Sequence, residues 1–477
     1  MEPFIHLHVH TQYSLLDGQA SIDALIDKAQ KDGMNAIAVT DHGNMFGIKE
    51  FFNKVSKKNG KPLGAIKDLE KEQKALKGKE ALSTEEQARL QEIPSLIEAE
   101  KKKIFKPIIG CECYCARNGR HNKTAKEDRS GYHLIILAKN LKGYKNLIKM
   151  VSISWTEGFY GRPRIDHELL EKYHEDLIVC SACLGGEIPQ HIMHDRIDKA
   201  EESILWFKKL FGEDYYLEMQ RHETHDPNAD CTTYPKQQEV NKVLIELARK
   251  HNVKLIATND VHFVNQEDAE AHDRLICLST GKDLDDPTRM RYSKQEWMKT
   301  TAEMNAIFAD IPEALSNTLE IADKVDFYSI DSGPIMPTFA IPEDFGTEES
   351  YREKFSEQDL FEEFTRDENG NVVLSEEDAK DKIKKLGGYD KLYRIKLEAD
   401  YLRKLTYDGA KICYGDNLND EVRERLDFEL HIMKTMGFPG YFLIVQDFIA
   451  AAREELGVSV GPGRGSAAGS LVSYTLG

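Results

Sequence analysis

Residues 4–10 read Phe-Ile-His-Leu-His-Val-His, an apolar run with a histidine at every second position from residue 6. Such alternation indicates a β-strand, on which side chains two residues apart share a face, so His8 and His10 should point the same way. Two further segments place similar polar residues at the end of an apolar run, Thr40-Asp41-His42 and Asn259-Asp260-Val261-His262. Imidazoles and carboxylates that converge from several strand ends are typical ligands of first-row metals. The sequence therefore predicts a metal centre that holds more than one ion.

Predicted strands and helices alternate from residue 4 to about residue 281. This alternation indicates an α/β fold with parallel strands and helical crossovers. Seven strands with polar residues at their C-terminal ends favour a closed β/α barrel, and a doubly wound open sheet is the alternative. The predicted helices are residues 21–32, 46–58, 187–211 and 237–251. The predicted strands are Phe4–His10, Ala36–His42, Pro107–Ala116, His133–Ala138, Leu177–Ala182, Tyr215–Met219 and Lys254–Val264.

One segment interrupts the alternation and another ends it. Residues 61–105 are rich in Lys, Glu, Ala and Leu, which predicts a helical hairpin inserted in a crossover. After residue 282 the alternation stops, and linker-like stretches lead into a largely helical region. We therefore expect two domains, residues 1–284 with the insertion 61–105, and residues 285–477.

The composition is that of a globular protein. Of the 477 residues, 40% are hydrophobic and 31% are charged, and no apolar run reaches the roughly 18–20 residues of a membrane span. Because the first predicted strand begins almost at Met1, we expect no cleavable leader. Eight cysteines lack the density of a disulfide scaffold, which predicts a cytoplasmic location. Cys111, Cys113 and Cys115 alternate along a predicted strand, and we interpret them as packing residues.

The formal net charge of −18 argues against a surface that grips nucleic acid as a whole, because phosphate binding draws on clustered Lys and Arg. Local basic stretches exist at residues 101–103 and at Arg162-Pro163-Arg164. We expect the lysine run to be a solvated face. A polyanionic substrate would therefore have to be received by metals and a few arginines, or by another part of the protein.

Nine side chains at or near predicted strand ends are candidate metal ligands. Glu112 interrupts an apolar strand, where an unpaired buried carboxylate is costly and a role bridging two metals removes that cost. Asp17 lies in a turn after the first strand, and Cys183 precedes a Gly-Gly pair. Asp41 is expected to orient a ligand imidazole. The candidates are His8, His10, Asp17, His42, Glu112, His133, Cys183, Asp260 and His262.

Several other histidines lie outside this set of nine candidates. His6 shares a face with His8 and His10, and the sequence leaves its role open. Histidines in helical or loop contexts are expected to be solvated; these include His191, His194, His222 and His225.

The order and spacing of the candidate ligands resemble the PHP (polymerase and histidinol phosphatase) family of metal-dependent phosphoesterases. The resemblance covers about residues 4–281, and all nine motif positions are filled. It implies a distorted (βα)7 barrel with three divalent metals, zinc or manganese, on its rim. It also implies phosphoester hydrolysis, with Glu112 and Asp260 as catalytic residues.

The resemblance further implies how the ligands divide among three metals. One metal would take His8, His10, Glu112 and Asp260, a second would take Glu112, His133 and Cys183, and a third would take Asp17, His42 and His262. Relatives often have histidine where this chain has Asp17 and Cys183. A thiolate at residue 183 favours zinc in that pocket.

A glycine-rich stretch near the end of the chain points to a second activity. Residues 459–470 read Ser-Val-Gly-Pro-Gly-Arg-Gly-Ser-Ala-Ala-Gly-Ser, between a short predicted strand and an apolar helix. Glycines allow close backbone approach, and a helix N-terminus attracts phosphate. A tight turn with small-residue packing is the alternative.

Together with residues 436–445, 310–318 and 6–18, this stretch resembles the alpha subunits of bacterial DNA polymerase III, from end to end apart from the insertion 61–105. The resemblance implies a palm turn in which Gly465, Ser466 and Arg464 contact the incoming nucleotide. It also implies that the carboxylates that bind two catalytic magnesium ions lie in a later stretch of the full-length protein, which this chain does not contain. We therefore expect that the chain ends inside the palm and does not polymerise DNA.

For the full-length protein, the same resemblance implies a DNA-directed DNA polymerase of DNA replication. The implied partners are DNA, deoxynucleoside triphosphates, the sliding clamp and other replisome subunits. The protein partners would bind through C-terminal regions. No interaction with a membrane is expected. Three functions remain for the present chain. They are a metal-dependent 3′–5′ exonuclease or phosphoesterase, a free-standing phosphatase of small metabolites, and a scaffold in which metals only staple the barrel.

Overall fold

The computed structural model describes residues 1–79, 81–333, 335, 337–461, 463 and 465–477. The chain divides into two compact units, Met1–Ile330 and Asp331–Gly477. No helix among the described residues is long and apolar enough to cross a membrane.

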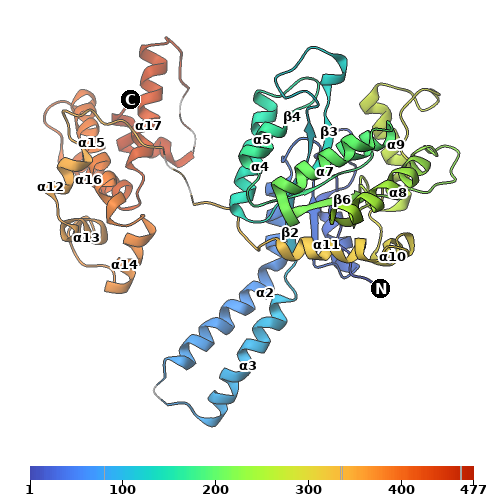
Figure 1. Cartoon of the computed structure of the whole chain (residues 1–477). Helices are drawn as coiled ribbons and strands as arrows, with labels where there is room; N and C mark the ends of the chain where they lie inside the picture. Colours follow the sequence, from blue (N-terminus) through green and yellow to red (C-terminus); the bar gives the residue numbers. More distant parts are fainter. Residues whose placement is uncertain (80, 334, 336, 462, 464) are drawn as a thin grey trace. The chain divides into compact units, whose positions relative to one another are not determined.

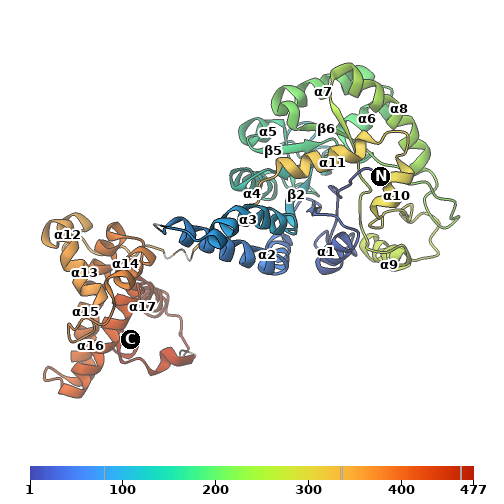
Figure 2. The same ribbon diagram turned by 90° about the horizontal axis from the view of Figure 1, so that it is seen from below.

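One curled sheet forms the body of the first unit, with helices packed around it (Figures 1 and 2). The strand order is β1-β2-β3-β5-β6-β7, and β4 pairs with β2. The α/β class and the curled, barrel-like sheet are therefore confirmed. The strands are β1 (Ala36–Val39), β2 (Lys106–Cys115), β3 (Tyr132–Ala138), β4 (Arg164–Ile165), β5 (Leu177–Cys180), β6 (Tyr215–Met219) and β7 (Lys254–Ala257).

The sheet is mixed, so the prediction that all strands run parallel was wrong. Strand β3 runs antiparallel to both β2 and β5, whereas the other pairs are parallel. Residues 116–131, between β2 and β3, contain one short 3-10 helix (Lys126–Arg129) and no α-helix that could cross the sheet. Antiparallel neighbouring strands, unlike parallel ones, can be joined by a connection without a crossover helix. Cys111, Cys113 and Cys115 on β2 are buried in the core, as expected for packing residues.

The predicted strand Phe4–His10 links the two edges of the sheet without forming a regular strand. On one side, the Val9 carbonyl accepts a hydrogen bond from the Thr40 N–H at 2.9 Å. On the other side, the His10 N–H donates to the Val261 carbonyl at 2.7 Å, and Val9 and Val261 form an isolated β-bridge. This segment brings the histidines of residues 6–10 to the ends of β1 and β7.

The helices of the first unit follow from apolar periodicity and capping. In α1, Ile22, Leu25, Ile26 and Ala29 are buried on one face, and the Ser21 side chain accepts the N–H of residue 24 as an N-cap. The predicted helix 187–211 is two helices. The α-helices of this unit are α1 (Ile22–Lys31), α2 (Ile48–Lys77), α3 (Thr84–Lys101), α4 (Leu141–Thr156), α5 (His167–Tyr173), α6 (Glu187–Met193), α7 (Ile197–Phe211), α8 (Thr233–His251), α9 (Ala269–Thr280), α10 (Thr301–Ile307) and α11 (Glu313–Lys324).

Helices α2 and α3 form a hairpin that projects from the body of the first unit (Figure 1). The hairpin has a small core of its own, formed by Ile66, Leu76, Ile93 and Ile97. Its first arm is continuous with the crossover helix from Ile48, because α2 runs through Gly60 and Pro62. Most of residues 61–105 lies in this hairpin, and the expected helix end near residue 58 was wrong.

The boundary between the units lies after Ile330, so the predicted boundary near residue 285 is corrected. Residues 285–330 pack on the barrel through long-range contacts. The Ile5 N–H donates to Thr318 Oγ1 at 2.9 Å, and the side chain of Asn317 donates to the carbonyl of Leu255 at 2.8 Å. Composition alone could not place the boundary, because this segment lacks strand–helix alternation but contributes apolar residues to the same core.

The regular secondary structure of the second unit is helical, and its described residues contain no β-strand. Two small cores hold it together, one around Leu360, Phe364 and Leu392 and the other around Leu402, Leu426 and Leu443. The predicted largely helical character is confirmed. The helices are α12 (Glu348–Lys354), α13 (Glu357–Thr365), α14 (Glu376–Lys385), α15 (Tyr389–Tyr414), α16 (Asp420–Thr435), α17 (Pro439–Glu454) and α18 (Leu471–Thr475).

Candidate metal centre

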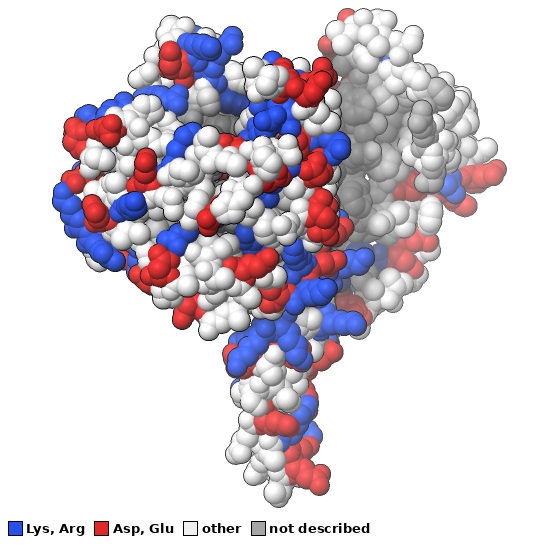
Figure 3. All heavy atoms as spheres, turned by 90° about the vertical axis from the view of Figure 1, so that its right-hand side faces the viewer, with Lys and Arg blue, Asp and Glu red and all other residues white. Residues whose placement is uncertain are grey.

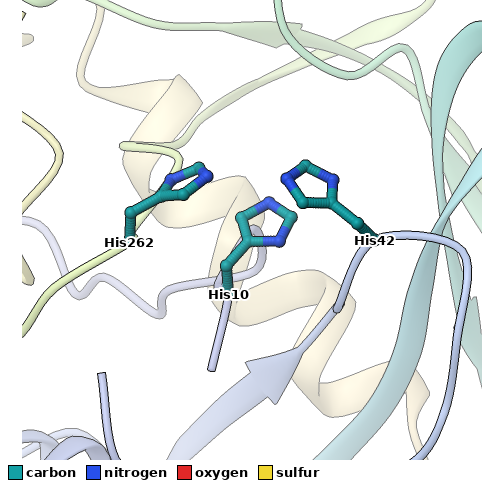
Figure 4. A group of neighbouring side chains, drawn as sticks. All are labelled: His10, His42 and His262. Atoms are coloured by element: carbon teal, nitrogen blue, oxygen red, sulfur yellow. The ribbon is translucent and has the colours of Figure 1, made fainter. Parts of the chain in front are cut away.

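The nine predicted ligands lie together at one end of the curled sheet. Isolated β-bridges join His42 to Glu112 and His133 to Gly186, so segments far apart in sequence meet there. Figure 4 shows the imidazoles of His10, His42 and His262, which come from three segments and lie side by side. Three groups of ligand atoms each fall within 4.8 Å of one another: His8, His10 and Glu112; Glu112, His133 and Cys183; and His10, His42 and His262.

The two aspartates lie against these histidine groups. Asp260 Oδ1 is 3.1 Å from His8 Nε2 and 3.2 Å from His10 Nε2. Asp17 Oδ2 is 3.1 Å from His42 Nε2, and Asp17 Oδ1 is 3.8 Å from His262 Nε2. Two ligand atoms that share one ion at about 2.0–2.2 Å stand roughly 3 Å apart. These separations are therefore compatible with shared ions.

Glu112 lies between two of the groups. Its Oε1 atom is 2.7 Å from His133 Nδ1, and its Oε2 atom contacts His42 Nδ1. The Cys183 sulfur lies 3.6 Å from His133 Nδ1 and 4.0 Å from Glu112 Oε1. Glu112 is 1% exposed, so this carboxylate has no access to solvent that could compensate for its burial.

Hydrogen bonds at the Nδ1 atoms orient three of the imidazoles. Ser14 Oγ donates its only proton to Asp41, so the His10 Nδ1–H must donate to Ser14 Oγ at 2.9 Å. The His8 Nδ1–H donates to Glu218 Oε1 at 2.6 Å, and the His262 Nδ1–H donates to a main-chain carbonyl two residues earlier at 2.8 Å. Each ring therefore directs its Nε2 atom to the cluster. This arrangement is usual for metal-binding histidines.

Several atoms of the cluster that could bind a metal are buried without a hydrogen-bond partner among the described residues. They are Nδ1 and Nε2 of His42, Oε2 of Glu112 and Oδ1 of Asp260. An unsatisfied buried polar atom costs about 1–3 kcal/mol, and native proteins keep few of them. Imidazole nitrogens, carboxylate oxygens and one thiolate are the donor set that zinc or manganese accepts. The residues present thus fit divalent metals.

The charges in the cluster shift the pKa values of its members in opposite directions. Burial alone would raise the pKa of Glu112, but the charges of His133 and His42, with the hydrogen bond from His133, hold it well below its usual range. Burial opposes the charged form of His8, yet the carboxylates of Asp260 and Glu218 raise its pKa well above the ordinary value. His8, His42 and His133 therefore retain protons beside ionised carboxylates, whereas burial and the neighbouring His42 and His262 lower the pKa of His10 to about 3.

Three residues at the site have left-handed backbone conformations that are unusual outside glycine. Asp260 has a φ of 48°, Leu16 before Asp17 has 60°, and Ala182 before Cys183 has 61°. Such conformations cost about 1–3 kcal/mol each and concentrate at functional sites. The fold therefore maintains local strain at the positions that orient three candidate ligands.

Glu218 was missed by the sequence analysis. It lies on β6, is 2% exposed, and its Oε1 also accepts hydrogen bonds from Thr258 at 2.6 Å and from Gln220 at 3.1 Å. The signal was available, because Glu218 interrupts the apolar strand Tyr-Tyr-Leu-Glu-Met just as Glu112 interrupts its own strand.

Replacing Glu218 with glutamine should weaken metal binding about 10- to 100-fold, because a neutral amide holds the His8 imidazole less firmly. The measurement is a competition titration against a chromophoric chelator. Glu320→Gln is the matched control, since Glu320 contacts Tyr216 on the same strand outside the cluster. Equal affinities for the two variants would show that Glu218 does not support the metal.

Residues 290–296, which lie beyond the predicted end of the first domain at residue 284, form one wall of the site. The Tyr292 hydroxyl donates to Asp17 Oδ1 at 2.8 Å, and the His262 N–H donates to the Glu296 carbonyl at 2.8 Å. These residues and the cluster enclose a cavity of about 240 Å³. Arg291 lines the cavity, and its Nε atom is buried without a hydrogen-bond partner in the described part of the chain.

His6, His222 and Asp41 have hydrogen-bond partners outside the nine-residue cluster. His6 is buried away from the cluster, with Nε2–H donating to the Lys299 carbonyl at 2.8 Å, and burial lowers its pKa to about 4. His222 is 3% exposed, so the expectation that it is solvated was wrong. Asp41 accepts hydrogen bonds from Ser14 and from residue 11, which places it behind His10, one step removed from the cluster.

The predicted nucleotide-binding residues lie in the second unit. Arg464 and the side chain of Ser466 lie outside the described residues. Gly465 begins a short 3-10 helix (Gly465–Gly469) and has a φ of 74°, a conformation that suits glycine. Their role in nucleotide binding stays a prediction.

Comparisons with known proteins match two parts of the chain to described families. Residues 6–222 match the PHP domain, and residues 400–477 match the bacterial DNA polymerase III alpha NTPase domain. DNA polymerase III subunit alpha of Borreliella burgdorferi is 40% identical over 99% of this chain and 32% of its own length. The corresponding subunits of Campylobacter jejuni and Thermus aquaticus are each 35% identical, over 100% and 99% of this chain and 33% and 35% of their own lengths.

The chain thus spans about a third of the length of the curated relatives that it matches. The PHP match covers most of the ligand-bearing strands, and the second match covers the glycine-rich stretch. The chain is therefore similar over nearly its whole length to the N-terminal region of the DNA polymerase III alpha subunits, with a PHP-domain match followed by a match to the alpha NTPase domain.

Proposed function

We propose that the cluster holds three divalent metals, zinc or manganese. His8, His10, Glu112 and Asp260 would hold one of them. Glu112, His133 and Cys183 would hold the second, and Asp17, His42 and His262 the third. The observation that carries this proposal is the convergence of nine donor side chains, several of whose buried atoms lack any other partner. Thiolate at Cys183 favours zinc in the second group.

We propose phosphoester hydrolysis as the activity of this site, with removal of 3′-terminal nucleotides from DNA as the reaction. Bound divalent ions supply Lewis acidity and neutralise developing charge in such reactions. Glu112 and Asp260 would hold the ions in position for catalysis. Arg291 would face a phosphate oxygen in the cavity, which gives its unpartnered Nε–H an acceptor.

For the complete protein, we propose DNA-directed DNA polymerase activity in DNA replication, in the cytoplasm. Its partners would be DNA, deoxynucleoside triphosphates, the sliding clamp and other replisome subunits, with magnesium at the polymerase site. The similarity to alpha subunits of DNA polymerase III supports this proposal. The match of residues 400–477 to the alpha NTPase domain also disfavours the free-standing phosphatase, because a small-metabolite enzyme has no need for such a region.

The test of hydrolysis uses 5′-labelled single-stranded DNA and metal-loaded protein. We expect stepwise shortening from the 3′ end, and loss of the reaction when a chelator is added. No shortening by fully metal-loaded protein would favour the alternative in which the metals only stabilise the barrel.

Metal affinity should rise with pH. The pKa values of His8, His42 and His133 are raised in the metal-free protein, mainly by Asp260 and Glu112 against the effect of burial. These imidazoles are therefore protonated at neutral pH, and a cation must displace their protons. We expect affinity to increase about tenfold per pH unit for each displaced proton. Calorimetry in buffers of different ionisation enthalpy measures the proton release, and a pH-independent affinity would contradict this prediction.

A further inference from the structure

Three aromatic side chains form a solvent-exposed row beside the metal centre. Phe46, Trp155 and Phe159 are 58%, 43% and 46% exposed. The ring centroids of Trp155 and Phe159 lie 5.6 Å apart with nearly parallel planes, and those of Phe46 and Trp155 lie 6.2 Å apart. Aromatic residues rarely remain this exposed in a contiguous group unless the group serves to bind something. We call these three residues the aromatic row.

The aromatic row is attached directly to the ligand-bearing turn. The Trp155 indole N–H donates to the Gly43 carbonyl at 2.8 Å, and Gly43 follows His42. A Cβ atom at Gly43 would lie 3.2 Å from the Tyr114 ring, so these segments are in tight contact. The Tyr114 ring stacks on His42 at 6.2 Å and meets His133 edge-on at 5.2 Å.

Positive charge accompanies the aromatic row on a chain that is acidic overall. The exposed Arg162 guanidinium lies 5.7 Å from the centroid of the Tyr114 ring, and the Arg129 guanidinium lies 5.9 Å from that of Tyr160. Elsewhere, acidic and basic side chains are interspersed over the face that Figure 3 displays. With a net charge of −18, the chain lacks a large positive field, so a polyanion must be held by local contacts.

We propose that the aromatic row stacks against unpaired bases of single-stranded DNA whose terminal phosphoester enters the metal cavity. This inference rests on the proposed hydrolysis and names its substrate class. Every base has a π-face, so stacking binds single strands without sequence preference. Duplex DNA stacks its bases on one another and offers no free faces to the row. Arg162, next to the row, supplies a cation for the phosphate backbone.

The experiment measures binding without hydrolysis, so that it is independent of whether the centre is catalytic. The protein is the full chain carrying Asp260→Asn, and the probe is a fluorescently labelled oligothymidylate followed by anisotropy. Adding Trp155→Ala or Phe159→Ala should weaken binding about 5- to 100-fold each, the loss of stacking with one base. Trp155→Phe should retain most of the affinity, because it keeps a ring at that position.

Two controls separate stacking from charge and from loss of folding. An abasic oligonucleotide of the same length and charge should bind weakly, and its affinity should not change with Phe159→Ala. Phe327→Ala is the matched variant, because Phe327 is 47% exposed and lies near Lys139, at the opposite end of β3 from His133. Its affinity for oligothymidylate should equal that of the Asp260→Asn parent.

Unchanged binding in both Trp155→Ala and Phe159→Ala would overturn the proposal, as would equal binding of the abasic strand. Either result would assign the aromatic row to another kind of partner, such as a protein. Preferential binding of blunt duplex DNA would overturn it as well. Binding that depends on the row, combined with no hydrolysis by the wild-type protein, would leave the inference intact and refute the proposed activity.

Discussion

Replacing Asp260 with asparagine should abolish 3′-terminal nucleotide removal, with a loss on the order of 10³–10⁵-fold in rate. Asp260 Oδ1 lies within 3.2 Å of Nε2 of both His8 and His10, and this buried atom has no hydrogen-bond partner among the described residues. Asparagine keeps the shape but removes the negative charge that offsets a divalent cation. The assay follows shortening of single-stranded DNA by wild type and variant purified in the same way.

The control for this experiment is Asp27→Asn, which removes an exposed carboxylate from α1. It should cleave as fast as the wild type. A contaminating nuclease would act equally in all three preparations. Equal cleavage by wild type and Asp260→Asn would therefore end the exonuclease hypothesis and leave the structural role of the metals in its place.

Replacing Arg164 with methionine should lower the free energy of unfolding of the first unit by about 3–5 kcal/mol. The Arg164 side chain is 1% exposed, and its guanidinium donates to four main-chain carbonyls. These belong to Gly158 at 2.9 Å, Asn122 at 3.0 Å, Asp128 at 2.6 Å and Arg120 at 2.8 Å. Methionine fills much of the volume but leaves the carbonyls without donors, and the loop 116–131 loses its attachment.

Tryptophan fluorescence in urea measures this effect in the first unit alone. Trp155, Trp206 and Trp297 are all the tryptophans of the chain, and all lie within Met1–Ile330. Arg162→Met is the control, because the exposed Arg162 side chain should contribute within about 0.5 kcal/mol. A loss below about 1 kcal/mol for Arg164→Met would show that water replaces the guanidinium, and that this buried network is not what holds the loop.

The sequence was informative where a polar residue interrupts or ends an apolar run. His8, His10, His42 and Glu112 occupy such positions, and the structure brings them together. A run that is buried on both faces leaves few places for a polar side chain, so each exception indicates a specific partner.

Features that depend on distant contacts could not be predicted. Nothing in the Tyr132–Ala138 sequence indicates strand direction, because alternation is the same in parallel and antiparallel sheets. Tyr292 and Arg291 lie in a segment without periodicity, and Tyr292 contacts a residue 275 positions earlier in the chain. The buried His222 donates its main-chain N–H to the side-chain carbonyl of Gln237, 15 positions later, at 2.8 Å. Such partners become visible only in the folded chain.

Anomalous X-ray diffraction can show whether the cluster holds three metals. Crystals of protein purified without chelator would be measured above and below the zinc and manganese absorption edges. We predict three anomalous peaks among the nine donor side chains, with the peak beside Cys183 appearing at the zinc edge. Absence of anomalous density between Glu112 and its histidine neighbours, together with less than one metal equivalent in solution, would contradict the claim.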